Sequence, residues 1–229
     1  AYAAGQPATL LPGGIAARAG LLADAGVPPS VSSAPILLNS LLDQVSFITL
    51  AAVAALWFPV ARMPALIMLA VLGALILAVS IPPLRHGLSS MLRALMKRFK
   101  WEQHWDEFAK SLGTVSTLHI LGSGVLITLL AKFLLVVILD LCLAGVGLNA
   151  SYPALLLAEA LPTILGRITP MPAGAGPTEA GMIGLLTSAA SLDVNTATAA
   201  VAIFRITTVM FHALLGALVF FIFWRGDKK

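Results

Sequence analysis

Five charged side chains lie in or beside strongly apolar parts of the sequence, where a charge usually marks a functional pathway or an ion pair. They are Arg18, Asp43, Arg167, Glu179 and Arg205. A guanidinium group binds phosphate through two parallel hydrogen bonds, and a carboxylate can hold the same guanidinium by ion pairing. These residue types therefore predict a site for a phosphate or another anionic head group.

Two proline- and glycine-rich motifs accompany these charges. Residues 11–14 read Leu-Pro-Gly-Gly, and residues 170–179 read Pro-Met-Pro-Ala-Gly-Ala-Gly-Pro-Thr-Glu. Broken helices expose backbone groups and helix dipole ends that can face a ligand. The candidate substrate-binding residues are thus Pro12, Gly13, Gly14, Arg18, Asp43, Arg167, Pro172, Gly174, Gly176, Glu179 and Arg205.

Glu179 is expected in the first turn of a helix, where the helix dipole favours a carboxylate. Arg205 lies deep in an apolar segment and needs an anion, which is either Glu179 or a substrate phosphate. Lys132 lies centrally in another apolar segment and could pair with Asp140, eight residues later in the sequence. For each of these charges, a structural ion pair is as reasonable as a functional role.

Other chemistry finds no support in the sequence. The four histidines form no ligand set, and no metalloprotease, phosphate-loop or nucleophile-elbow motif occurs. We therefore expect no metal, no cofactor and no covalent catalysis, and we favour a protein that is not an enzyme.

Composition places the chain in a membrane. Of 229 residues, 59% are apolar and only 10% are charged, whereas a soluble domain is about 25% charged. So little polar surface cannot cover a water-facing globule, which excludes soluble, disordered, collagen-like and nucleic-acid-binding classes. The single cysteine, Cys142, lies in an apolar run and is interpreted as a small hydrophobic residue.

A membrane-spanning helix needs about 20 apolar residues. The sequence offers four such segments, at residues 34–60, 63–81, 115–142 and 196–224. Residues 84–113 are polar and basic, with apolar side chains at spacings of three and four, which predicts an interfacial amphipathic helix. We expect an all-α transmembrane bundle in one domain, divided into residues 1–83, 84–113 and 114–229. The opening residues lack methionine and a signal peptide, so we also expect helices upstream.

Basic residues predict the orientation. Segment 84–113 carries six lysines and arginines, and the tail at residues 225–229 carries three more. The positive-inside rule places both in the cytoplasm. We therefore expect a multi-pass protein of the cell (inner) membrane with a cytoplasmic C-terminus.

Residues 152–165 and 181–190 are each too short to cross a hydrocarbon core of about 30 Å. Residues 166–179 between them contain prolines and glycines that cannot continue a helix. We interpret the region as a re-entrant hairpin that enters and leaves from the outer side. The alternative is a kinked pair of helices that spans conventionally, which would conflict with the basic tail.

The first motif resembles the second, and each is followed by a small polar turn and a long span. The two spans run in opposite directions by the charge argument. This arrangement predicts two inverted re-entrant hairpins, as in many secondary transporters. Coincidence of two proline–glycine turns is the alternative.

The second motif resembles the P-x-P-G-G-x-G-x-x-E signature of the lysylphosphatidylglycerol synthase transmembrane region, a family that includes flippase domains and stand-alone membrane proteins. Phe204-Arg205-Ile206 with Gly216 is similar to its final helix, and Leu41-Leu42-Asp43 to an earlier element. Three features differ. Ala173 replaces a glycine, Ser40 replaces an arginine, and the first motif lacks its acidic residue.

The resemblance implies a lipid-handling membrane module without the synthetic domain. Together with the arginines, it predicts translocation of an anionic or aminoacylated phospholipid, and a possible homo-oligomer or synthase partner. Two alternatives stay open. One is a membrane-embedded transferase acting on a lipid carrier, for which a metal-binding acidic cluster would be expected and is not found. The other is a non-catalytic partner subunit of a lipid or glycan synthase.

Overall fold

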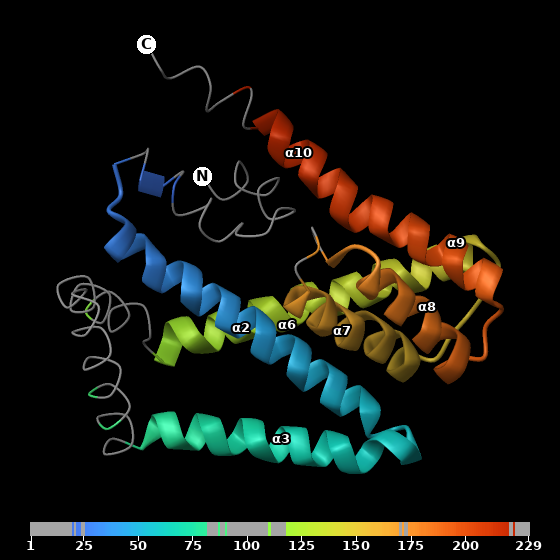
Figure 1. The fold of residues 1–229 in the computed structure, drawn as a ribbon, viewed down its shortest axis with the longest axis horizontal. Coiled ribbons are helices and arrows are strands. Elements are labelled where there is room, and N and C mark those ends of the chain that lie inside the picture. The colour runs from blue at the N-terminus through green and yellow to red at the C-terminus, as the bar shows by residue number, and fades with distance from the viewer. Residues whose placement is uncertain are drawn as a thin grey trace.

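The computed structural model describes residues 26–81, 118–169, 171 and 174–219, together with isolated positions 20, 22, 23, 87, 90, 110 and 222. Every regular element in these ranges is a helix, as predicted. The elements are α2 (Pro29–Ala55), α3 (Pro59–Ser80), α6 (Leu118–Gly145), α7 (Tyr152–Ile168), α8 (Pro177–Ala189), α9 (Val194–Arg205), the π-helical turn η3 (Ile206–Met210) and α10 (Phe211–Val219). Figure 1 shows that α9, η3 and α10 follow one another as one long rod.

Three helical stretches are long and apolar enough to cross a membrane: Ser32–Ala55, His119–Gly145 and Val194–Val219. Only about a fifth of the most apolar window of each is fully buried inside the protein, so many of their apolar side chains keep exposed surface. Leu126, Ile127 and Leu130 of α6 are each more than half exposed. Such apolar surface is expected where helices contact lipid.

The remaining predicted segments differ in their boundaries. The first predicted span, residues 34–60, starts close to the observed stretch Ser32–Ala55 but extends too far, because α2 ends at Ala55 and α3 already begins at Pro59. The segment at 63–81 corresponds to α3, in which Ala61–Ala74 qualifies as a shorter apolar helix. The amphipathic segment 84–113 and the first proline–glycine motif lie outside the described ranges.

Proline sets the start of several helices. Helices α2, α3, α7 and α8 each carry a proline in the first turn, where its missing N–H group costs no hydrogen bond and its fixed φ angle suits the helix. This rule explains the error at the first span. Pro59 starts α3 after the short turn of Leu56–Phe58, so the chain reverses there, three residues before Arg62.

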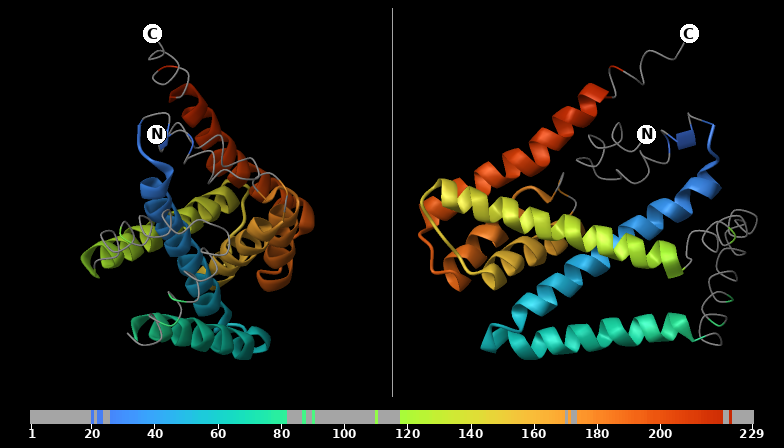
Figure 2. Two further views of the ribbon diagram at one scale, coloured as in Figure 1. Left: turned by 60° about the vertical axis from the view of Figure 1, so that its left-hand side comes forward. Right: turned by 180° about the vertical axis from the view of Figure 1, so that it is seen from behind.

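Helices α7 and α8 form a hairpin, with α6 and α9 on one flank and α2 on the other (Figures 1 and 2). The predicted helix break is confirmed, although it is shorter than residues 166–179. Helix α7 continues through Gly166, Arg167 and Ile168, and α8 begins at Pro177. Entry of both helices from one side of a membrane stays a prediction.

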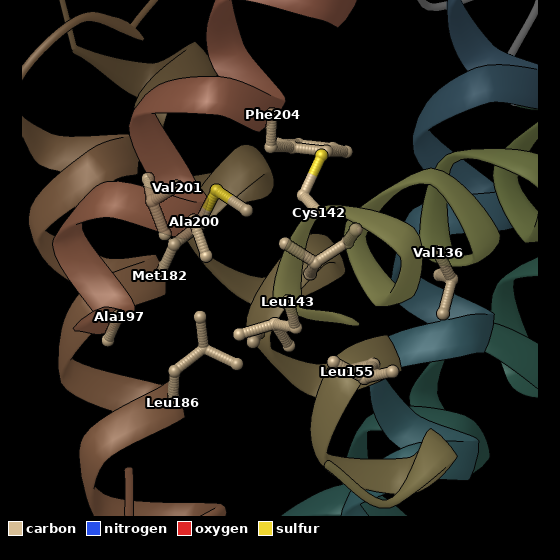
Figure 3. Close-up of a cluster of buried hydrophobic side chains, with 12 residues drawn as sticks. Val136, Cys142, Leu143, Leu155, Met182, Leu186, Ala197, Ala200, Val201 and Phe204 are labelled. Carbon is tan, nitrogen blue, oxygen red and sulfur yellow. The ribbon is translucent and has the colours of Figure 1, made fainter. Parts of the chain in front are cut away.

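The main apolar core joins four helices around this hairpin. Val136, Leu139 and Leu143 of α6 meet Leu155 of α7, Met182 and Leu186 of α8, and Ala197, Ala200, Val201 and Phe204 of α9, as Figure 3 shows for most of them. Two smaller clusters connect α7 to α2 and α3. Neighbouring residues of α7 contribute to all three clusters, since Leu157, Ala158 and Ala160 each belong to a different one. Helix α7 is therefore the central element.

Close contact between α7 and α8 depends on Gly181. A Cβ atom at this position would lie 2.8 Å from Cβ of Pro162, a rigid residue within α7, whereas a Cβ atom at Gly184 would meet nothing within 4 Å. We therefore expect Gly181→Ala to destabilise the protein by about 1–3 kcal/mol through overpacking. Gly184→Ala should be neutral or stabilising by up to about 1 kcal/mol, because alanine favours helix. Thermal unfolding in detergent tests both variants, and equal midpoints would contradict this packing.

Candidate functional site

Asp43 of α2 connects three helices. Its Oδ1 atom lies 2.5 Å from Nζ of Lys132 on α6, and its Oδ2 atom accepts a hydrogen bond from Nη2 of Arg167 on α7. Nη1 of Arg167 also donates to Oε1 of Gln44, at 3.4 Å. Helices α2 and α6 also approach each other closely at Leu42, the residue before Asp43. A Cβ atom at Gly124 of α6 would lie 2.9 Å from Cδ1 of this leucine. Helix crossing therefore brings the carboxylate within reach of Lys132.

The two cations of this cluster share an aromatic ring. Nζ of Lys132 lies 4.2 Å from the ring centroid of Phe47, and Cζ of Arg167 lies 4.8 Å from it. Phe47 is 2% exposed, so the contact with the largely buried Lys132 forms in a desolvated setting, where cation–π interactions are strongest. The Lys132 side chain is 13% exposed and that of Arg167 is 40% exposed. Arg167 is thus the cation of this cluster that faces outward.

The predicted pairing of Lys132 with Asp140 is wrong. Eight residues along a helix correspond to about 12 Å of rise, and Lys132 instead reaches Asp43 on a neighbouring helix. Asp140 accepts a hydrogen bond from the Tyr152 hydroxyl at 3.4 Å.

A second ion pair lies between α8 and the last rod. Nε of Arg205 lies 2.5 Å from Oε1 of Glu179, and the backbone N–H of Gly176 donates to Oε2 of Glu179 at 2.6 Å. The predicted location of Glu179 in the first helical turn and its pairing with Arg205 are both confirmed. Arg205 is the last residue of α9, directly before the π-helical turn η3. Such turns often occur at functional sites.

The loop that joins Arg167 to Glu179 is closed by direct backbone contact. A Cβ atom at Gly174 would lie 2.9 Å from Cα of Gly166, and a Cβ atom at Gly166 would collide with Oγ1 of Thr178. Gly174 and Gly176 also have φ angles of +65° and +90°, which other residues rarely adopt. Glycine at these positions therefore fixes where the two helix ends, and their charges, lie.

The candidate residues fall into three groups. Asp43 and Arg167 meet in the first cluster, Glu179 and Arg205 form the second pair, and Gly174 and Gly176 shape the loop between them. The others, Pro12, Gly13, Gly14, Arg18 and Pro172, lie outside the described residues. Among described residues, no three His, Cys, Asp or Glu side chains gather where they could hold a metal ion.

The structure adds one charged residue that the sequence analysis missed. Glu159 lies at the middle of α7, is 3% exposed, and its Oε2 atom has no hydrogen-bond partner among the described residues. The signal was a lone carboxylate in the apolar run Ala154–Leu165, the same criterion that selected Asp43. Gln44, Phe47 and Lys132 join the site only through tertiary contacts.

One arginine–carboxylate pair therefore lies at each end of the glycine-rich loop: Arg167 at one end is held by Asp43 of α2, and Glu179 at the other end holds Arg205 of α9. Each guanidinium keeps donors in a planar fork that suits a phosphate. The arrangement can exchange a carboxylate for an incoming anion without leaving an arginine unpaired.

The three-helix cluster can be tested by a double-mutant cycle. Asp43→Asn leaves Lys132 and Arg167 facing each other uncompensated, so we expect a lower unfolding midpoint in detergent. Lys132→Met should cost less, because Arg167 still neutralises Asp43. The double variant should recover part of the loss, with a coupling energy of about 1 kcal/mol or more. Additive losses would contradict the shared ion pair.

Comparison with known proteins agrees with this picture. The family model for the lysylphosphatidylglycerol synthase TM region matches residues 2–216. Neither a curated protein nor a solved structure gives a significant match. Since the match covers nearly the whole chain, and since the described helices carry the expected apolar spans, the chain is a membrane protein that belongs to the lysylphosphatidylglycerol synthase transmembrane-region family.

Proposed function

We propose that this protein moves an anionic or aminoacylated phospholipid between the two leaflets of the cell membrane. The observation that carries the proposal is the placement of two arginine–carboxylate pairs at the two ends of one broken-helix loop. Family membership supports it, because the family is named for a synthase of an aminoacylated phospholipid.

Binding would begin by exchange of ion-pair partners. The phosphate of a lipid head group offers oxygens to Arg167, whose side chain is 40% exposed, and to Arg205. Asp43 remains neutralised by Lys132, and Glu179 keeps the hydrogen bond from the N–H of Gly176. Release of the arginines therefore leaves neither carboxylate without a partner, which keeps the exchange inexpensive.

The acyl chains would remain in the bilayer while the head group crosses. Helix α6 presents a row of exposed apolar side chains, including Leu126, Leu130 and Leu134, against which the chains can lie. In this proposal the α7–α8 hairpin is re-entrant and its loop lies near the membrane centre, where irregular backbone is tolerated beside a wet cavity. The motif with Pro12, Gly13, Gly14 and Arg18 would form the inverted counterpart, and the C-terminus would be cytoplasmic.

Translocation can be measured with the full chain in liposomes that contain fluorescent phosphatidylglycerol. Dithionite bleaches only the outer leaflet unless the protein moves lipid outward during the assay. We expect loss of inner-leaflet protection with wild type. Glu179→Gln and Arg205→Ala should each slow the process by about tenfold or more, because a hydrogen bond to a charged group contributes about 1.5–3 kcal/mol.

Arg62→Ala is the matched control, since Arg62 is an exposed arginine outside the site whose Nε donates to the backbone carbonyl of Leu56. It should move lipid at the wild-type rate. Full protection by every variant and by wild type would count against translocation of this lipid. A co-purifying synthase would then favour the partner-subunit alternative.

Arg167→Lys tests whether the fork of the guanidinium matters. Lysine keeps the charge and the ion pair with Asp43 but cannot bind a phosphate through two parallel N–H groups. We expect a slower rate for Arg167→Lys than for wild type and a further decrease for Arg167→Ala. A wild-type rate for the lysine variant would show that a point charge suffices.

A further inference from the structure

Among the residues that the structure describes, Glu159 is the one buried charged group that the proposed lipid-binding step does not use. It lies midway along α7, between Ala158 and Ala160, which belong to different apolar clusters. Its side chain is 3% exposed and its Oε2 atom has no hydrogen-bond partner among the described residues. A negatively charged carboxylate with a buried oxygen that receives no hydrogen bond is unfavourable, and protonation removes its charge. The residue therefore has a physical reason to carry a proton.

The charges that act on Glu159 come from the cluster described above. They are Lys132 on α6, Arg167 on α7 and Asp43 on α2. Helix α8 contributes Glu179, which is paired with Arg205, and the remaining carboxylate of α6, Asp140, contacts Tyr152. Glu159 thus responds electrostatically to the same three groups that hold the arginine of the candidate lipid site.

The charge balance of this cluster couples protonation of Glu159 to binding of an anion. Lys132 and Arg167 supply two positive charges and Asp43 one negative charge, which leaves one net positive charge when Glu159 is neutral. An ionised Glu159 would neutralise that charge, and so would a bound phosphate. Both together would give an excess negative charge among apolar helices, which is costly. A bound anion therefore favours protonated Glu159, and by reciprocity protonation favours anion binding.

We propose that Glu159 takes up a proton when an anionic head group binds at Arg167, beside the Lys132–Asp43 pair, so that a proton accompanies the lipid. The inference rests on the proposed function and names its coupling ion. The proton comes from water and adds to a carboxylate oxygen of Glu159, and it returns to water when the head group leaves. Arg167, the exposed member of the cluster, marks the side from which water reaches it.

The sign of the pH effect follows directly. At low pH Glu159 is already neutral, so the anion binds without further proton uptake and binds most tightly. As pH rises, binding must draw a proton from solution and weakens. Glu159→Gln mimics the neutral acid, so its affinity should not change with pH through this group.

The experiment is isothermal titration of the purified full chain with a short-chain phosphatidylglycerol, from about pH 5 to about pH 8, in two buffers of different ionisation heat. The difference in heat gives the protons taken up for each lipid bound. We expect about one proton at the alkaline end for wild type and none for Glu159→Gln. At that pH the glutamine variant should also bind roughly tenfold more tightly than wild type.

Asp140→Asn is the matched control, because it removes a carboxylate from α6 that contacts Tyr152 instead of the cluster. It should keep the wild-type proton uptake. Glu159→Asp is the second variant, for the case in which Glu159→Gln fails to fold. It retains a titratable carboxyl group and should keep the proton uptake.

The outcomes separate the two proposals. Binding without proton uptake in wild type would overturn the proton site and leave lipid binding intact. Uptake that persists in Glu159→Gln would overturn the assignment to Glu159. Absence of phosphatidylglycerol binding at every pH would count against both.

Discussion

The need to pair the cations that lie among apolar helices governs this structure. An isolated charge between apolar helices costs several kcal/mol, so each buried cation draws a carboxylate from another segment. Asp43 thereby ties α2 to α6 and α7, and Glu179 ties α8 to the last rod. Both constraints meet at the α7–α8 hairpin, because its two helix ends carry Arg167 and Glu179. Apolar packing fills the space between the helices, and these pairs tie them together at defined positions.

Much of the architecture could be predicted from sequence because it depends on local chemistry. Apolar length indicates the spans, and proline with glycine indicates the helix break before Pro177. The pairing of Glu179 with Arg205 was also predictable, since a deep arginine requires an anion and few candidates exist. The exact end of α2 and start of α3 were harder to predict from sequence. Pro59 can end one helix or begin the next, and only packing decides between the two.

Tertiary contacts explain what the sequence could not show. Lys132 has a carboxylate on its own helix, yet its partner lies on α2, because the crossing of α2 and α6 determines distance where sequence spacing does not. Phe47 is one of many apolar residues in its segment and gains its role only beneath two cations. Glu159 was visible as a lone acid, but its isolation from donors appears only when the neighbouring helices are in place.

The division of labour between the two oxygens of Glu179 has a mechanical consequence. Oε2 is held by the backbone N–H of Gly176, and Oε1 by Arg205. Departure of Arg205 would break only one of these contacts, so the carboxylate stays anchored to its own helix terminus. The paired and separated states would then differ in the position of the Arg205 side chain, while the Glu179 carboxylate stays in place. The Glu179 carboxylate would therefore offer Arg205 the same position each time the ion pair forms again, whichever anion had displaced it.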